Sequence, residues 1–393
     1  MRILQLHNHH GSLGGAMEVL AHEAELLTGA GHAVRTYALP PTEELGLGPL
    51  RAGAKAVWNV GACREVAAHI KDFRPDVVHV HTPFPLLSPA VFRTAKRLGV
   101  PTVTTLHSYR YSCIAATCHR DGAVCEDCIG KRVKLPGLVH RCYHDSLGAS
   151  AALTLSLAVH RAAGTFHRYV DRYLTLTEFS RTLLIRDGFP AAKVVVKPNS
   201  VPDPGLASAE RPAERYVAFA GRLMDIKGVE TLLDGWSRAD TGDLRLRVAG
   251  DGPLRSLVEE RSRQDPTLSY EGWIDEQAVY EFMGGADAVL VPSEWYEGLP
   301  LVILRSLAVG TPVIVSDLEN FSAAVVNDDA GEAFRVADVG ALADALSRLV
   351  RDPAAWIGRR VNARASYEKR YSPEVDVVRL EAIYADVLST VVA

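Results

Sequence analysis

The chain has 393 residues, 48% of them hydrophobic, which is too long for one ordinary domain and provides ample core for two. Its formal net charge of -4 and its pI of about 6.4, without any basic run, exclude nucleic acid as an expected partner. The apolar run after Arg2 is shorter than that of a signal peptide, and the longest uncharged stretch, residues 146–160, is shorter than a membrane span. We therefore expect a cytoplasmic protein with at most peripheral membrane contact.

In the first half of the chain, apolar runs alternate with amphipathic segments, a pattern typical of parallel strands joined by crossover helices. The first predicted helix covers residues 14–28. The predicted strands are residues 2–7, 33–39, 76–81, 102–107 and 173–177. These segments predict an α/β domain over residues 1–198.

A stretch rich in Pro, Ser and Ala, residues 199–214, interrupts this alternation and predicts an interdomain linker. A second α/β domain is expected over residues 215–372, followed by a closing helical segment, residues 373–393, with its helix at about 374–391. The predicted strands of this domain are residues 216–222, 244–250, 268–273, 288–293 and 312–316. Two doubly wound sheets of this kind predict a ligand cleft along the carboxyl ends of both sets of strands.

Several loops that follow predicted strands carry residues suited to phosphate. Arg222 and Lys227 lie between a strand and a helix that begins near Gly228, where a planar guanidinium and a point charge would suit a diphosphate. A solvated basic loop explains the same two residues about as well. Gly14 and Gly15 would let the backbone approach a ligand closely at the start of the first helix. Glycines also follow strands at AGDGP and EGWI, and together these loops indicate a phosphate-rich ligand between the domains.

The chain resembles the retaining glycosyltransferases of family 4. The resemblance rests on the GG near the first helix, TLH at 105–107, GRLxxxKG at 221–228, GDGP at 250–253 and PSxxxEGLPLV at 292–302, and it spans nearly the whole chain. It implies the GT-B fold, in which two Rossmann-like doubly wound parallel-sheet domains face each other across a cleft. The N-terminal domain would bind the acceptor and the C-terminal domain the nucleotide-sugar donor, and the last helix would cross back to the N-terminal domain.

The resemblance also implies roles for matched positions. Arg222 and Lys227 resemble the pair that neutralises the donor diphosphate as it leaves, whereas His107 and Glu297 resemble the residues that contact the donor sugar. These four are the expected catalytic residues, and no cofactor is implied for catalysis. Further donor contacts are implied for the phosphate-binding residues Gly14, Gly15, Gly298, Leu299, Pro300, Leu301 and Val302 and for the nucleobase-binding residues Gly272, Trp273 and Ile274.

The implied activity is transfer of a hexosyl unit from a nucleotide sugar to an acceptor hydroxyl, with retention of configuration. No nucleophile is evident, and the resemblance therefore implies that the acceptor attacks on the same face as the leaving group. The departing phosphate itself would then accept the proton of the acceptor. The alternatives are a sugar phosphorylase, a transferase with an unusual donor, or a degenerate GT-B protein that binds without turnover. Polysaccharides, lipid carriers, antibiotic aglycones and small polyols all remain open as acceptors.

Position 305 departs from the family pattern. Counting from Glu297, Arg305 stands where the E-x7-E motif has its second glutamate, which accepts hydrogen bonds from the donor ribose. A guanidinium only donates. Arg305 would therefore contact the ribose with reversed polarity, bind an extra phosphate, or pair with an acid such as Glu294. A tolerated surface substitution is the remaining explanation.

Five of the six cysteines lie between residues 113 and 142, within an insertion at about 108–146 that directly follows His107 and is expected to cover the acceptor side. The spacing of Cys113, Cys125, Cys128 and Cys142 suits a structural zinc ion. The spare ligand candidates are Cys118, His119, His140 and His144. Free thiols in a helical insertion and disulfides are the alternatives, and a cytoplasmic location disfavours disulfides.

Overall fold

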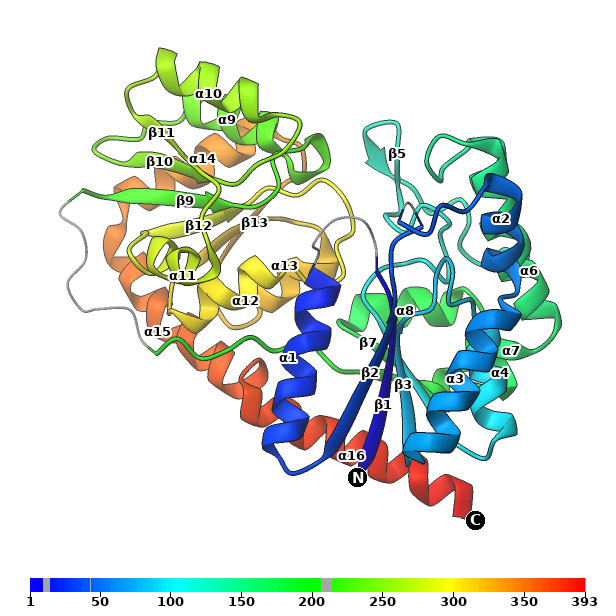
Figure 1. Cartoon of the computed structure of the whole chain (residues 1–393). Coiled ribbons are helices and arrows are strands. Elements are labelled where there is room, and N and C mark those ends of the chain that lie inside the picture. Colours follow the sequence, from blue (N-terminus) through cyan, green and yellow to red (C-terminus); the bar gives the residue numbers. More distant parts are fainter. Residues whose placement is uncertain (10–14, 43, 206–213, 393) are drawn as a thin grey trace. The chain divides into compact units, whose positions relative to one another are not determined.

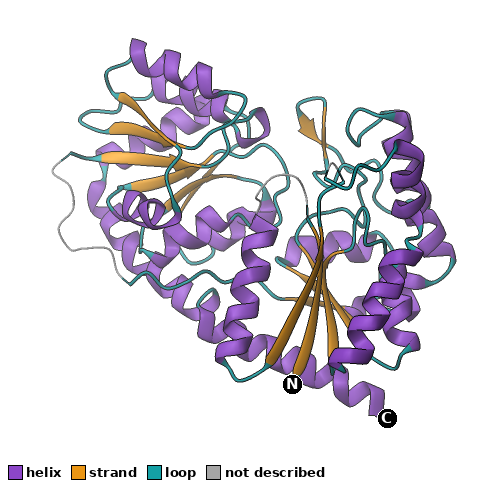
Figure 2. Ribbon diagram, viewed as in Figure 1, coloured by secondary structure: helices purple, strands orange, loops and turns teal. Residues whose placement is uncertain are grey.

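The computed structural model describes residues 1–9, 15–42, 44–205 and 214–392, and it divides into two compact units. The first unit comprises residues 1–120, residues 125–199 and the chain from Asp376 onward, and the second comprises residues 121–124 and 200–375. Each unit contains one six-stranded parallel sheet with helices packed around it (Figures 1 and 2). The predicted α/β class, with two Rossmann-like sheets, is confirmed.

The sheet of the first unit has the strand order β2-β1-β3-β4-β7-β8. Its strands are β1 (Arg2–Asn8), β2 (Ala33–Leu39), β3 (Val77–Thr82), β4 (Thr102–Leu106), β7 (Arg172–Thr175) and β8 (Val194–Val196). Its helices are α1 (Gly15–Gly29), α2 (Pro49–Val57), α3 (Val60–Phe73), α4 (Ala90–Arg97), α5 (Leu135–Val139), α6 (Leu147–Ala162), α7 (Thr165–Arg168), α8 (Glu178–Arg186) and most of α16 (Pro373–Val392). The five predicted strands begin and end within two residues of those found, and β8 was not predicted.

The two faces of this sheet differ in polarity, because successive side chains of a strand point to opposite faces. One face is apolar and packs with α3 and α4, through residues such as Leu4, Val78 and Val80. The other face begins with Ile3, Val77 and Val103, which pack with Leu27 of α1 and Leu380 and Val387 of α16. Two positions further along the strands, this face carries Gln5, His79 and Thr105, and then His7, His81 and His107. A polar row therefore lies at the carboxyl ends of β1, β3 and β4.

The sheet of the second unit has the strand order β11-β10-β9-β12-β13-β14, the doubly wound order of the Rossmann fold. Its strands are β9 (Tyr216–Ala220), β10 (Arg245–Ala249), β11 (Leu268–Gly272), β12 (Ala288–Val291), β13 (Val313–Ser316) and β14 (Gly331–Phe334). Its helices are α9 (Val229–Arg238), α10 (Arg255–Gln264), α11 (Glu276–Gly284), α12 (Leu301–Ala308), α13 (Glu319–Val326), α14 (Val339–Arg351) and α15 (Pro353–Arg370). Among the described helices, none is long and apolar enough to cross a lipid bilayer.

The insertion at residues 108–146 consists mainly of turns, with the short strands β5 (His119–Arg120) and β6 (Ala123–Val124) and the helix α5. The helical insertion that was one of the alternatives for this segment is therefore not found. Asp187, after α8, holds this segment. Its carboxylate accepts hydrogen bonds from the backbone N–H of Gly130 at 2.7 Å and from the buried ammonium of Lys134 at 2.6 Å, and it also pairs with Arg161. A buried ion cluster thus attaches the insertion to the first unit.

Candidate functional site

In the second unit, two loops meet at the carboxyl ends of the neighbouring strands β9 and β12. The strand order reverses between β9 and β12, and this switch point is where open α/β sheets bind ligands. The loop after β9 carries Arg222 and Lys227, and the loop after β12 carries Glu297. The backbone N–H of Glu294 donates to the carbonyl of Ile226 at 2.9 Å, which joins the two loops.

Glycine is needed where these loops touch. Gly228 has a φ of 68°, and a Cβ added there would lie 2.0 Å from the carbonyl oxygen of Pro292. Gly250, in the GDGP motif, packs against the loop after β9, and its Cβ would lie 1.8 Å from the carbonyl oxygen of Gly221. Such close approach is open only to glycine. These two glycines therefore serve loop packing, which brings the charged side chains of the site together.

Lys227 and Glu297 form an ion pair at this switch point, with Nζ 2.6 Å from Oε2. The side chain of Glu297 is 9% exposed, and the hydroxyl of Ser293 donates to its other carboxylate oxygen, Oε1. The side-chain amide of Asn320 also donates to the backbone carbonyl of Glu297. Glu297 is thus held on three sides. The ammonium of Lys227 has three donors, so it can hold this carboxylate and still donate to a ligand oxygen.

Arg222 supplies a further positive charge on the loop that carries Lys227. Its side chain is exposed and makes no ion pair or hydrogen bond with any other residue that the structure describes. The helix α12 begins at Leu301, directly after the loop that carries Glu297, and its N-terminal residues include Val302. Unpaired N–H groups at a helix N-terminus favour anions. Arg222, Lys227 and the segment from Gly298 to Val302 thus make this edge suitable for a phosphate group.

The predicted nucleobase segment follows β11. Gly272 is the last residue of that strand and has a φ of 72°, Trp273 is 74% exposed, and Ile274 is partly buried. Gly15 is the exposed first residue of α1 in the other unit. Gly14 lies outside the described residues.

Arg305 pairs with an acid other than the one we named. Its Nη2 lies 3.1 Å from Oε1 of Glu276, at the start of α11. Glu294, the partner suggested from the sequence, instead accepts a hydrogen bond from the hydroxyl of Thr231 at 2.6 Å. The reason is that α11 and α12 pack side by side, which brings residues 29 positions apart into contact. A carboxylate therefore does lie beside position 305, but it comes from another helix.

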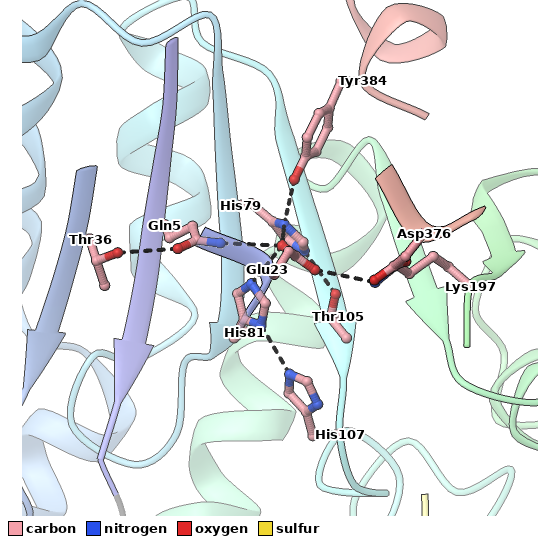
Figure 3. Close-up of polar contacts among 10 residues, drawn as sticks. All are labelled: Gln5, Glu23, Thr36, His79, His81, Thr105, His107, Lys197, Asp376 and Tyr384. Carbon is pink, nitrogen blue, oxygen red and sulfur yellow. Dashed lines mark hydrogen bonds and ion pairs between the residues drawn. The ribbon is translucent and has the colours of Figure 1, made fainter. Parts of the chain in front are cut away.

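In the first unit, His107 follows β4 directly and is partly buried. Its Nε2 lies 3.0 Å from Nδ1 of His81, and the two rings are stacked with centroids 5.3 Å apart. The Nε2 of His81 in turn lies 3.2 Å from Oε1 of Glu23 (Figure 3). Burial lowers the pKa of His81 to about 4 and holds the pKa of His107 well below its usual value. Both imidazoles are therefore neutral near pH 7.

Glu23, on α1, is the centre of this buried cluster (Figure 3). Its Oε1 also lies 2.9 Å from Nδ1 of His79 and 3.3 Å from Nε2 of Gln5, and its Oε2 lies 3.3 Å from the ammonium of Lys197. Lys197 also pairs with Asp376 of α16 at 2.8 Å. Burial alone would raise the pKa of Glu23, but His79 and Lys197 outweigh it and hold that pKa well below its usual range.

The same cluster meets the distance requirement for a metal site, because one ligand atom each from Glu23, His79 and His81 lies within 4.8 Å of the others. The ammonium of Lys197 contacts the same carboxylate, however, and would repel a cation. All of these side chains are buried and already paired with protein groups. We therefore interpret the cluster as a hydrogen-bonded network rather than a metal centre.

The cysteines of the insertion are free thiols, so the disulfide alternative is not supported. Among the described residues, one group of three has ligand atoms that all lie within 4.8 Å of one another, and it is Glu23, His79 and His81. The four predicted zinc ligands, Cys113, Cys125, Cys128 and Cys142, therefore do not come close enough together to bind one ion. The same holds when Cys118, His119, His140 and His144 are included. A hydrogen bond from Cys118 lowers the pKa of Cys113 to about 6. As arranged, these thiols do not fit a zinc ion, and the zinc site stays a prediction.

Sequence reasoning missed Glu23, His79, His81, Lys197 and Asp376, although two signals were available. Glu23 lies four positions after Val19, three after Leu20 and four before Leu27, so it shares one face of the helix with these apolar residues. A charged residue thus lies on an otherwise apolar helix face. His79 and His81 alternate with Val78 and Val80 and so share one face of β3. Each signal points to a buried polar group that needs a partner.

Comparisons with known proteins cover both units. Residues 13–203 match the family model described as Glycosyltransferase Family 4, and residues 214–352 match the one described as Glycosyl transferases group 1. An exopolysaccharide phosphotransferase of Streptomyces coelicolor is 27% identical over 228 residues, which cover 56% of this chain and 24% of that protein. A glycogen synthase of Mycobacterium tuberculosis is 27% identical over 301 residues, which cover 75% of this chain and 64% of that protein. The chain thus spans less than two thirds of these curated relatives.

Among solved structures, HepE of Anabaena in complex with UDP and glucose has a TM-score of 0.68. The sequences are 17% identical, and the likeness covers 98% of this chain and 100% of that one. At this identity the likeness concerns the fold.

Proposed function

This chain belongs to the group 1 glycosyl transferases and has the GT-B fold, and from that premise we propose that it transfers a hexosyl unit from a nucleotide sugar to an acceptor hydroxyl. We further propose that the configuration at the transferred carbon is retained. The observation that carries the proposal is the ion pair of Lys227 and Glu297 at the switch point of the second sheet, with the exposed Arg222 on the same loop as Lys227. The binding of UDP and glucose by HepE supports a nucleoside diphosphate sugar as the donor.

Arg222 and Lys227 would hold the donor diphosphate. Negative charge grows on the diphosphate as the bond to the sugar breaks, so cations fixed next to it stabilise the transition state more than the bound donor. Lys227 cannot move freely, because Glu297 holds its ammonium at 2.6 Å. The N-terminus of α12 would add backbone donors to the same phosphates.

Glu297 and His107 would contact the sugar itself. The Oε1 of Glu297 accepts from Ser293 and its Oε2 from Lys227. A carboxylate oxygen can accept more than one hydrogen bond, so a sugar hydroxyl would donate to this fixed carboxylate. No second carboxylate is needed as a nucleophile in this scheme, because the acceptor hydroxyl attacks on the same face that the phosphate leaves. The departing phosphate takes the proton of that hydroxyl. Catalysis then depends on the two cations, which stabilise the leaving diphosphate, rather than on a pair of carboxylates.

Arg305 and Glu276 would together form hydrogen bonds with the donor ribose. Glu276 is held 3.1 Å from the guanidinium, so the pair offers both a donor and an acceptor where the family uses a single glutamate. The carboxylate that position 305 lacks would thus be supplied by α11. We propose altered donor recognition from this exchange, and the nucleobase and the sugar remain to be measured.

A panel of UDP, GDP, ADP, TDP and CMP tests donor binding, because a ligand that binds only the folded state raises its melting temperature. We expect at least one nucleotide to raise the melting temperature of the wild-type protein and to do so less in Arg222→Ala.

For the acceptor we propose a hydroxyl of a polysaccharide, lipid carrier or small molecule. We place the reaction in the cytoplasm, which the six free thiols support.

A further inference from the structure

We propose that Glu23 is a positioning residue that acts through His81 and fixes which ring nitrogen of His107 is free to accept a hydrogen bond from the ligand. The inference rests on the proposed function, since His107 is the histidine that we place against the donor sugar. The geometry behind it is a continuous chain of contacts, from Oε1 of Glu23 to Nε2 of His81 at 3.2 Å and from Nδ1 of His81 to Nε2 of His107 at 3.0 Å (Figure 3).

The first step fixes the proton on His81. Glu23 is ionised, with the buried ammonium of Lys197 next to its Oε2. A carboxylate can only accept hydrogen bonds, so the Nε2 of His81 that faces it must carry a hydrogen. Burial keeps His81 neutral, and a neutral imidazole has one N–H. Its Nδ1 is therefore an acceptor.

The second step fixes the proton on His107. Because Nδ1 of His81 accepts, Nε2 of His107 must donate to it across their 3.0 Å contact. The ring of His107 is also neutral, so its Nδ1 is left without a hydrogen. His107 can then accept a hydrogen bond from a sugar hydroxyl at Nδ1. The logic is that of the Ser-His-Asp triad, in which a buried carboxylate holds an imidazole in the correct tautomer.

The contacts of Glu23 explain why Gln is an informative substitute. The amide oxygen of a Gln side chain would turn toward the positive charge of Lys197, because the amide nitrogen and the ammonium are both donors. The amide N–H would then face His81 and donate to its Nε2. Both histidines would have to exchange their tautomers to keep their hydrogen bonds. Glu23→Gln therefore reverses the chain of donors while it changes the size of the side chain little.

A second branch of the same cluster provides a matched control. Nδ1 of His79 lies 2.8 Å from the hydroxyl of Tyr384, and its Nε2 lies 2.8 Å from the hydroxyl of Thr105. This branch shares Glu23, and the ring of His79 lies against that of His81 with centroids 4.3 Å apart. The two hydrogen bonds of the branch join His79 to Tyr384 and Thr105, and not to His81 or His107. Thr105→Val removes one buried hydroxyl from it without a change in side-chain shape. This variant should leave the tautomers of His81 and His107 unchanged.

The test is nitrogen-15 NMR of the full chain labelled at histidine, with the signals of His81 and His107 assigned from His81→Gln and His107→Asn. We expect both rings to carry hydrogen at Nε2 in the wild type and in Thr105→Val, and at Nδ1 in Glu23→Gln. In turnover of a nucleotide sugar, Glu23→Gln should lower kcat by about 10-fold to 100-fold and change KM by less than about 3-fold, while Thr105→Val stays within about 2-fold of the wild type.

A wild-type His107 with hydrogen at Nδ1 would overturn the proposal, and so would a folded Glu23→Gln with wild-type tautomers and wild-type kcat. If Glu23→Gln does not fold, the wild-type tautomers and the activity of His81→Gln decide the question. We expect the kcat of His81→Gln to fall to the same extent as that predicted for Glu23→Gln. If instead the wild type shows the expected tautomers but turns over no nucleotide sugar, the proposed function fails and the positioning of His107 by Glu23 stands.

Discussion

The ammonium of Lys227 lies 2.6 Å from the carboxylate of Glu297, although 70 positions separate the two residues in the chain. They meet because β9 and β12 are neighbours in the sheet and the loops that follow these strands pack against each other. Two strands that are adjacent in space but distant in sequence thereby bring a cation and an anion to one ligand-binding edge.

Replacement of Lys227 should remove most of the activity. Lys227→Ala takes away a cation that stabilises the leaving diphosphate, so turnover should fall by about 100-fold or more, and Lys227→Arg should retain part of it because the charge remains. Steady-state kinetics with a nucleotide sugar measures both variants, and circular dichroism confirms that they fold. An unchanged rate in a folded Lys227→Ala would contradict the assignment of the site.

Replacement of Arg305 should change the relative affinities for nucleotides. Arg305→Glu restores the carboxylate of the family pattern but places it beside Glu276, which the guanidinium now holds at 3.1 Å. Calorimetric titration of each nucleotide into the wild type, Arg305→Glu and Glu276→Gln would show the change. If all three proteins bound every nucleotide with identical affinity, neither residue would contact the donor.

Loss of the carboxylate at position 187 should destabilise the first unit. Asp187 neutralises two cations, and the side chain of one of them, Lys134, is 0% exposed, so Asp187→Asn leaves a buried charge without a counter-charge. We expect a loss of about 3 to 5 kcal/mol in the free energy of unfolding by urea. Glu126→Gln is the control, because it breaks the exposed ion pair with Arg186 and should cost about 1 kcal/mol or less. Equal stabilities of the two variants would refute the anchoring role of Asp187.

Stability should fall in acid between pH 6.5 and pH 4. Burial lowers the pKa of His81 and of His160 from 6.5 to about 4, so in this window the unfolded chain binds a proton at each histidine that the folded protein does not. The stability that depends on the neutral rings is complete above pH 6.5 and is lost as the pH falls, by up to about 1.4 kcal/mol per pH unit for each histidine.

Urea unfolding at a series of pH values measures this slope, and His160→Gln should reduce it. His160 is a suitable position because it lies apart from the proposed site and contacts Val57 and Thr165. A free energy of unfolding that did not change between pH 7 and pH 5 would show that neither histidine is held neutral.

The predicted zinc site is tested by metal analysis of the purified protein. Because the four thiols do not converge in the described structure, we expect less than about half an equivalent of zinc, together with thiols that react with a thiol reagent. About one equivalent of zinc, lost in Cys125→Ser, would instead establish the site.

Much of the fold could be predicted, because alternation of apolar and polar residues directly reflects a buried strand. β2 begins and ends at the predicted residues, 33 and 39. The motif at 221–228 likewise indicated that Lys227 follows a strand. Its ion pair with Glu297 was not predicted, because the two residues come from segments that are distant in the chain. The strands β8 and β14 were missed, since β8 has only three residues and the four residues of β14, Gly331–Phe334, include Glu332 and form no apolar run.

The network around Glu23 could not be predicted in the same way. Its members come from α1, β3, the segment after β8, and α16, so each lies in a segment whose own pattern gives no partner. A charge on a buried helix face shows that a partner must exist, because an unpaired buried carboxylate is costly, but only the fold shows that the partner is Lys197. Among the alternatives for Arg305, pairing with an acid is what the structure has, but Glu294 was the wrong example for the same reason, since Glu276 lies on a neighbouring helix.

The most direct test of the central claim is release of nucleotide from a panel of nucleotide sugars by the wild-type protein without acceptor, with Arg222→Ala as the comparison. A transferase whose cations stabilise the leaving diphosphate should slowly hydrolyse at least one donor, and Arg222→Ala should be at least about 10-fold slower. A folded wild-type protein that binds nucleotide but releases none from any donor would show that the chain binds nucleotide sugars without transferring them.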